Sequence, residues 1–175
     1  PYVVLHPTRG ISAERDRWPV RTLGRLAREL AGSPSGAATS VIVSGSEADR
    51  PLVEPIAQLG GAVSFAGRTS LGEFGALAAG ARAVVAMDSG PMHIAAAVGA
   101  PTLGIFPLRS DEPSRWAPLG PHTAILRGTY PCPPSHRKET CPDFACVDAL
   151  EVPRVLAALD GLLARGRERR GDALT

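Results

Sequence analysis

The sequence contains no apolar run long enough to cross a lipid bilayer, and no positively charged start followed by an apolar core of the kind that marks a signal peptide. Cysteine is scarce, with 3 residues in 175, and this odd number favours reduced, packed thiols over a disulfide scaffold. A chain of this length can bury a core without such crosslinks. These absences predict a cytoplasmic protein.

Several nucleotide and hydrolase motifs are also missing. No G-x-G-x-x-G fingerprint follows the first apolar run, and the chain has neither a Walker G-K-[ST] segment nor a G-x-S-x-G elbow. Their absence argues against a dehydrogenase, a nucleotide-hydrolysing motor and a serine hydrolase. The formal net charge of +2 is ordinary, and we predict no nucleic-acid partner.

Lysine is nearly absent, because Lys138 is the only lysine among the 19 basic residues. The others are arginines, whose guanidinium groups suit phosphate and carboxylate ligands. Arg165, Arg167, Arg169 and Arg170 cluster near the end of the chain. We interpret this cluster as a solvated helix end, and contact with an anionic membrane surface is the alternative.

Short apolar runs alternate with helical patterns along the whole chain. Strands are predicted at 2–5, 41–43, 62–65, 84–87, 102–106 and 123–126, and helices around 23–30, 53–59, 71–78, 91–98 and 152–163. This alternation predicts an α/β fold, with a Rossmann-like parallel sheet of about six strands and helices on both faces. No long linker interrupts the pattern, so residues 1–175 are expected to form a single domain.

The most informative junction follows the predicted strand at 84–87. Asp88, Ser89 and Gly90 form a turn into a helix whose first N–H groups have no partner within the helix. Together with the helix dipole they predict a phosphate or diphosphate site, which His93 in the first turn would contact. The alternative is that Asp88 or Ser89 only caps the helix and that His93 is packed at the turn.

Ligands of open parallel sheets bind at the carboxyl ends of the strands, so the other strand-end loops matter as well. Thr8, Arg9 and Arg17 follow the first strand and offer hydrogen-bond donors for a diphosphate. The alternative is that this loop is only an exposed, charged connection. Glu47 follows the second strand and is suited to accept from ribose hydroxyls. Its alternative role is an interaction with a helix dipole.

Four potential zinc ligands, Cys132, His136, Cys141 and Cys146, lie in one proline-rich loop. Their spacing matches no standard paired C-x-x-C site. We therefore predict no metal site and keep zinc as the alternative.

Several segments, in this order, resemble the heptosyltransferases, the family 9 glycosyltransferases of lipopolysaccharide core synthesis. The strongest is Asp88-Ser89-Gly90-Pro91-Met92-His93, with Ala95-Ala96-Ala97 and Gly99-x-Pro101 downstream. The others are His6-Pro7 ahead of Arg17-Trp18-Pro19, Gly45-Ser46-Glu47-x-x-Arg50, 66–71 and the cysteine-containing stretch 132–146. Joined together, these segments cover nearly the whole chain.

The resemblance implies a GT-B architecture, in which two Rossmann-like domains enclose the active site. This chain would be the C-terminal, donor-binding half, and the early strand at 2–5 also indicates a piece of a longer polypeptide. Family members transfer heptose from ADP-heptose to the lipopolysaccharide inner core with inversion and without an essential metal or other cofactor. The N-terminal acceptor domain, which supplies the presumed catalytic base, is absent from this chain, so we expect donor binding but little or no transfer.

The resemblance also assigns donor-binding roles. Asp88 and His93 would lie by the sugar and diphosphate, and Ser89 and Gly90 would offer backbone N–H groups to the phosphates. Thr8 would contact phosphate as well, and Glu47 would hold the ribose. Arg9 and Arg17 complete the predicted donor site, and no catalytic residue is expected in this half.

One position departs from the family. The family commonly has a phosphate-binding lysine two residues before the tryptophan, where this chain has Asp16. Arg15 or Arg17 would supply the charge instead. A different nucleotide sugar is therefore one alternative, and a non-catalytic nucleotide-binding or regulatory domain is another. We predict a cytoplasmic location, with peripheral association at the inner membrane face as a further option.

Overall fold

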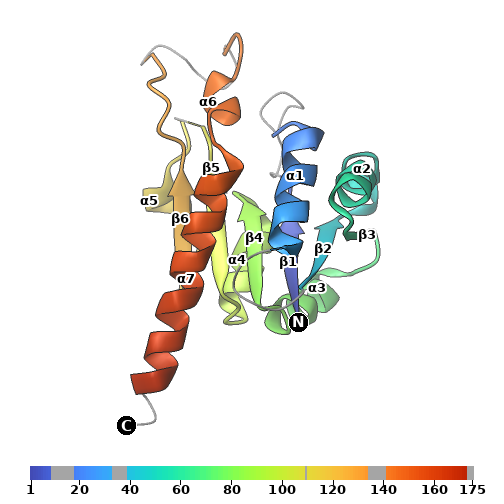
Figure 1. Cartoon of the computed structure of the whole chain (residues 1–175), viewed down its shortest axis with the longest axis vertical. Coiled ribbons are helices and arrows are strands. Elements are labelled where there is room, and N and C mark those ends of the chain that lie inside the picture. The colour runs from blue at the N-terminus through green and yellow to red at the C-terminus, as the bar shows by residue number, and fades with distance from the viewer. Residues whose placement is uncertain (9–17, 33–38, 109, 134–140, 173–175) are drawn as a thin grey trace.

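A parallel β-sheet forms the centre of the protein (Figure 1). The computed structural model describes residues 1–8, 18–32, 39–108, 110–133 and 141–172, with the backbone alone for 167–172. The strands are β1 (Tyr2–His6), β2 (Ser40–Gly45), β3 (Val63–Ala66), β4 (Ala83–Met87), β5 (Thr102–Phe106) and β6 (Thr123–Arg127). Within the described residues these six strands pair in the order β3-β2-β1-β4-β5-β6, and all pairings are parallel.

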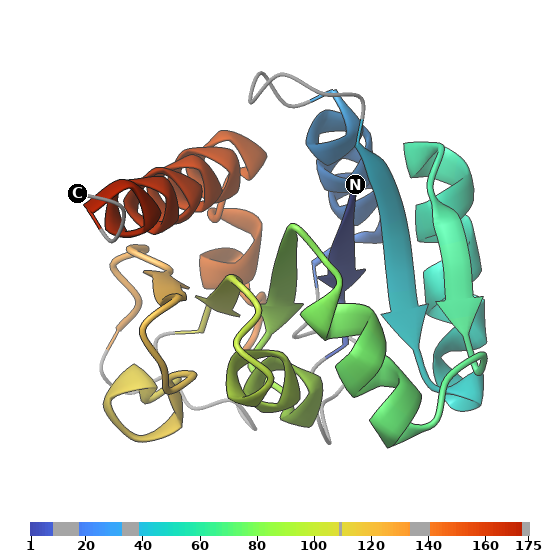
Figure 2. The same cartoon turned by 90° about the horizontal axis from the view of Figure 1, so that it is seen from below.

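Helices cover both faces of this sheet (Figure 2). They are α1 (Val20–Ala31), α2 (Arg50–Gly60), α3 (Leu71–Ala79), α4 (Gly90–Ala97), α5 (Pro113–Trp116), α6 (Ala145–Asp148) and α7 (Val152–Asp172), with a 3₁₀ helix, η2 (Glu47–Asp49), before α2. One apolar core joins the sheet to α1, α2 and α7, and a second joins it to α3 and α4. The predicted fold class, strand number and two-sided helical cover are therefore confirmed.

The central strands are mostly apolar because both of their faces are covered. Val3 and Leu5 of β1 pack into the first core, and Val4 between them packs into the second. This follows from the alternation of side chains along a strand. The continuous valine and alanine run of β4 is buried at every position for the same reason.

The sequence patterns missed α5 and α6 and placed the end of the last helix too early. α5 and α6 have four residues each, which is too short for a helical period to be visible. The apolar stripe stops at 163, but α7 continues to Asp172, so the arginine cluster lies in the last part of this helix, as its interpretation as a helix end predicts. Among the described residues, no helix combines the length and the apolar character needed to cross a membrane.

Trp18 anchors the start of α1 to a distant part of the chain. Its side chain is 2% exposed, and its indole N–H donates to the Val147 carbonyl in α6 over 2.8 Å. Pro19 follows as the N-cap residue of α1. The Trp18-Pro19 pair is therefore structural.

The order of the strands creates a crevice beside β1. From β1 the chain proceeds to β2 and β3 on one side, and it then returns to β4 on the other side of β1. The loops that leave β1 and β4 therefore run in opposite directions from neighbouring strand ends. In open α/β sheets this switch point is where ligands bind.

Candidate functional site

A cleft of about 370 Å³ opens at this switch point. Its walls come from the ends of β1 and β2 and from the beginnings of α3 and α4. The described residues that line it are His6, Thr8, Gly45, Ser46, Asp49, Thr69, Ser70, Leu71, Phe74, Ser89, Gly90, Pro91 and Ile94. Four segments that are far apart in sequence thus meet in one concave surface.

The beginning of α4 presents backbone rather than a side-chain cap to this cleft. Ser89, the N-cap residue, has an extended backbone, and its hydroxyl donates to the Met87 carbonyl over 2.9 Å. Ser89 thus occupies the N-cap position, but its side chain makes no capping hydrogen bond to the helix. The Gly90 N–H, at the first helical position, has no intrahelical acceptor, and Pro91 carries no N–H. This end of the helix can receive an anion.

His6 at the end of β1 is a site residue that the sequence analysis did not single out. Its ring lines the cleft but is only 6% exposed. Nδ1 lies 3.0 Å from the Ser44 hydroxyl, and Nε2 lies 2.8 Å from the Thr8 hydroxyl. Burial lowers the pKa of His6 to about 4, against a smaller opposing effect of the Asp49 carboxylate. His6 is therefore neutral at pH 7.

An apolar wall faces these polar groups. Phe74 of α3 meets the His6 ring edge to face, with the ring centroids 5.9 Å apart. Leu71 at the start of α3 and Ile94 of α4 extend the wall. Leu71 is 75% exposed, so this part of the wall is open to solvent.

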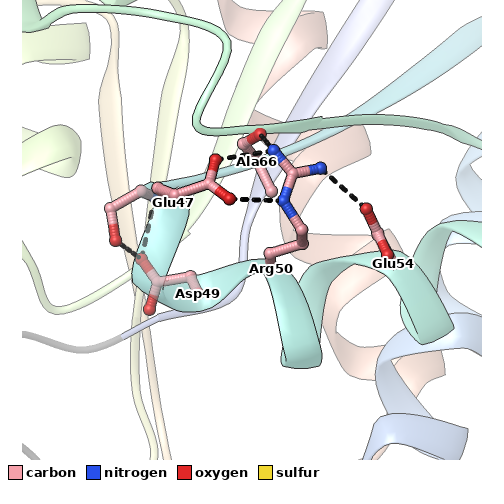
Figure 3. Close-up of polar contacts among 6 residues, drawn as sticks. Glu47, Asp49, Arg50, Glu54 and Ala66 are labelled. Carbon is pink, nitrogen blue, oxygen red and sulfur yellow. Dashed lines mark hydrogen bonds and ion pairs between the residues drawn. The ribbon is translucent and has the colours of Figure 1, made fainter.

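Glu47 belongs to a second polar cluster beside the cleft (Figure 3). Its two carboxylate oxygens accept from Nε and Nη2 of Arg50 over 2.7 and 2.6 Å, and these bonds hold the pKa of Glu47 below its usual value. The same guanidinium donates to Glu54 over 2.8 Å and to the Ala66 carbonyl over 3.0 Å. Each carboxylate oxygen has lone pairs left for a ligand, since Arg50 uses one on each.

The backbone beside Glu47 leaves room for its carboxylate only because residue 67 is a glycine. Gly67 follows β3 with φ +66°, and a Cβ there would lie 2.0 Å from Oε2 of Glu47. Its N–H donates to the Gly45 carbonyl over 2.9 Å, which ties the ends of β2 and β3 together. A side chain at position 67 would therefore collide with the Glu47 carboxylate, and glycine leaves that space open.

The structure brings some of the predicted donor-binding residues together and leaves others at the margin. Thr8, Ser89 and Gly90 line the cleft. Glu47, Asp88 and His93 lie outside its described lining, although Asp88 and His93 flank lining residues in the chain. Their ligand contacts stay predictions. Arg9, Arg15, Asp16 and Arg17 lie outside the described residues.

The zinc hypothesis concerns the segment that leads into α6 and the first turn of α6 itself. Cys132 and Cys141 are partly buried and Cys146 is buried, while His136 lies outside the described residues. In the part of the chain that the structure describes, no group of three or more His, Cys, Asp or Glu side chains is arranged to hold a metal. The predicted absence of a metal site stays a prediction.

Residues 1–143 match the family described as glycosyltransferase family 9 (heptosyltransferase). The chain belongs to this family. A curated relative, lipooligosaccharide heptosyltransferase 2 of Haemophilus influenzae, is 36% identical over 117 residues, which cover 63% of this chain and 32% of that protein.

Solved structures show the same fold. ADP-heptose LPS heptosyltransferase II of E. coli aligns with a TM-score of 0.75 and 24% identity, over 95% of this chain and 47% of that one. E. coli heptosyltransferase WaaC, solved with ADP, aligns with a TM-score of 0.70 and 18% identity, over 92% and 44% of the two chains. This chain therefore spans less than half the length of these relatives.

Proposed function

We propose that this chain is the donor-binding half of an inverting heptosyltransferase that moves heptose from ADP-heptose to the lipopolysaccharide inner core. The observation that carries the proposal is the cleft at the switch point, which is lined both by Thr8 and by the start of α4, where the N-cap residue Ser89 makes no side-chain cap. Relatives of the same fold have been solved with ADP and with an ADP-2-deoxy-2-fluoro heptose, which supports a nucleotide-sugar donor.

The proposed chemistry is the departure of ADP from the sugar. Negative charge builds on the β-phosphate as the glycosidic bond breaks, and a pre-oriented helix start stabilises that charge. In this proposal the N–H groups of Ser89 and Gly90 and the hydroxyl of Thr8 bind the diphosphate, with Asp88 and His93 beside the sugar. Glu47 accepts from the ribose hydroxyls.

The proposal places the acceptor and the catalytic base in a separate N-terminal domain. Residues 1–175 then form one nucleotide-sugar-binding domain that binds donor but transfers sugar slowly or not at all without that domain. The reaction would take place in the cytoplasm, at the inner face of the membrane that holds the acceptor. Because Asp16 stands in place of the family lysine, a nucleotide sugar other than ADP-heptose is the alternative donor.

Calorimetry with ADP tests the donor site. We expect Glu47→Ala and His93→Ala each to weaken ADP binding, by about tenfold for Glu47 because a charged acceptor is lost. Glu54→Ala is the matched control. Glu54 also pairs with Arg50, but it lies in α2, one turn after Arg50, whereas Glu47 precedes this helix. With 2′,3′-dideoxy-ADP the effect of Glu47→Ala should disappear. Unchanged affinity in both Glu47→Ala and His93→Ala would contradict the site assignment.

A further inference from the structure

We propose that Ser44, His6 and Thr8 form a hydrogen-bond relay that directs the Thr8 O–H toward an oxygen of the donor diphosphate. This inference rests on the proposed function and adds two buried residues, His6 and Ser44, behind the Thr8 hydroxyl at the cleft surface. Thr8 would contact the ligand, whereas His6 and Ser44 would act through it as positioning residues.

The relay joins two neighbouring strands. His6 is the last residue of β1, and Ser44 lies near the end of β2, which pairs with β1 in parallel. Each ring nitrogen of His6 has one hydroxyl within hydrogen-bond distance, Ser44 at 3.0 Å and Thr8 at 2.8 Å. The edge-to-face contact with Phe74 restrains the ring from a third direction. The imidazole is therefore fixed in position and orientation.

The burial of Ser44 selects the tautomer of this ring. Ser44 is 1% exposed, and no other acceptor bonds its hydroxyl within the described residues. If His6 carried its proton on Nδ1, it would donate to Ser44, and the buried Ser44 proton would have no acceptor. If Nδ1 is bare, the Ser44 O–H donates to it and is satisfied. Because a buried donor without an acceptor is costly, the structure favours the Nε2–H tautomer.

The tautomer in turn decides what Thr8 offers to the cleft. An Nε2–H group donates to the Thr8 oxygen and leaves the Thr8 proton free to point into the cleft. A bare Nε2 would instead accept the Thr8 proton and leave only lone pairs toward the ligand. Phosphate oxygens are acceptors, so only the first arrangement binds them. The hydrogen bond that the Thr8 hydroxyl accepts from His6 also polarises its O–H group. This polarisation strengthens the hydrogen bond from Thr8 to the phosphate oxygen.

The neutral state of His6 fits this role. Asp49, which also lines the cleft, is the charged group that acts on His6, and its own carboxylate accepts from Ser46 O–H over 2.6 Å and from Ser46 N–H over 2.8 Å. Phe74 and Ile94 face the cleft from α3 and α4 and carry no charge. The site therefore holds His6 as a fixed dipole between two hydroxyls.

The first test reads the tautomer directly, without a nucleotide. Long-range ¹H–¹⁵N spectra of the His6 ring should show protonation at Nε2 alone at pH 7. Ser44→Ala removes the group that holds Nδ1 bare, so this variant should show a mixture of tautomers. Ser40→Ala, at an exposed serine of the same strand, is the control and should leave the His6 signals unchanged. A wild-type ring protonated at Nδ1 would overturn the proposal.

The second test measures ADP affinity in a double-mutant cycle. Thr8→Val should weaken binding about tenfold, and Thr8→Ser, which keeps the hydroxyl, should restore most of the affinity. Ser44→Ala should weaken binding about threefold in the wild-type background and not at all in Thr8→Val, because it acts only through Thr8. His6→Gln, whose amide can donate to Thr8, should bind ADP better than His6→Asn.

The outcomes separate the relay from the proposed function. A chain that binds no nucleoside diphosphate would contradict the proposed function and, with it, the role of the relay in donor binding. A chain that binds ADP with full affinity in Ser44→Ala would contradict the relay alone. A loss in Ser44→Ala that persists in the Thr8→Val background would also overturn it, because the serine would then act on stability rather than on Thr8.

Discussion

The environment of His6 differs most from what its residue type leads one to expect. A histidine at the mouth of an anion-binding cleft is ordinarily a candidate cation. Here the ring is buried between two hydroxyls and an aromatic face, which lowers its pKa to about 4. In the proposed donor site, His6 therefore adds no positive charge at pH 7, and the proposed donors to the anion are backbone N–H groups and the Thr8 hydroxyl.

This burial predicts a pH dependence of stability. The unfolded chain protonates His6 as the pH falls through 6.5, whereas the folded ring stays neutral until about pH 4. The free energy of unfolding should therefore decrease between these two values, by on the order of 3 kcal/mol at most, and regain its full value above pH 6.5. Urea unfolding of the wild type and of His6→Gln at several pH values measures this contribution as the difference between them. Parallel pH profiles would contradict it.

At the scale of elements, the turns after β2 and β3 decide the geometry of Glu47. Gly67 adopts φ +66°, and its N–H bonds to the Gly45 carbonyl. Gly61, at the end of α2, has nearly the same conformation, with φ +64°, but a Cβ there would meet nothing within 4 Å. The two glycines thus share a backbone requirement and differ in what lies beside them.

Gly67→Ala and Gly61→Ala should separate these two effects. Both substitutions place a Cβ in the left-handed region, so each should lower the free energy of unfolding by roughly 1–2 kcal/mol. Only Gly67→Ala forces the Glu47 carboxylate away from its place beside Arg50, because the new Cβ would lie 2.0 Å from Oε2. We therefore expect weaker ADP binding in Gly67→Ala alone. Equal ADP affinities in the two variants, measured by calorimetry, would contradict a role for Glu47 in binding.

At the scale of the whole molecule, the cleft depends on the strand order. The groups from β1, β2, α3 and α4 meet only because β1 lies between β2 and β4 in the sheet. In the proposed architecture, the complete active site lies between this cleft and a separate N-terminal domain. Ligand binding to this half should therefore be measurable even if transfer is not.

A thermal-shift screen tests this expectation and identifies the base of the donor. A ligand that binds the folded state alone stabilises it by about 2.7 kcal/mol at a concentration 100 times its Kd, which corresponds to a rise in Tm of roughly 5–10 °C for a domain of this size. We expect ADP and ADP-heptose to give larger shifts than UDP and GDP. Adenosine, which lacks the phosphates, is the control and should give a much smaller shift. No shift with any diphosphate would favour a domain without this donor site.

The sequence by itself determined the layered fold, and it placed the candidate ligand site at the strand ends where the cleft lies. Apolar runs of strand length between helical periods specify a parallel sheet, because burial on both faces leaves no polar alternation. The segment 88–93 and Thr8 were predicted from local chemistry, since a strand that ends in a helix start exposes N–H groups whatever surrounds it. This local feature, the free N–H groups at a helix start, does not depend on which elements pack around it.

Only the tertiary structure decided which of these groups face one another. The pairing of His6 with Ser44, 38 positions apart, depends on the adjacency of β1 and β2, and no spacing in the sequence encodes it. The ion pair of Glu47 with Arg50 is local, but the glycine that makes room for it stands after a different strand. Burial, which sets the protonation of His6, is a property of the assembled sheet and helices. Residue types therefore supply the functional groups, and tertiary packing fixes the protonation state of His6 and the direction of its hydrogen bonds.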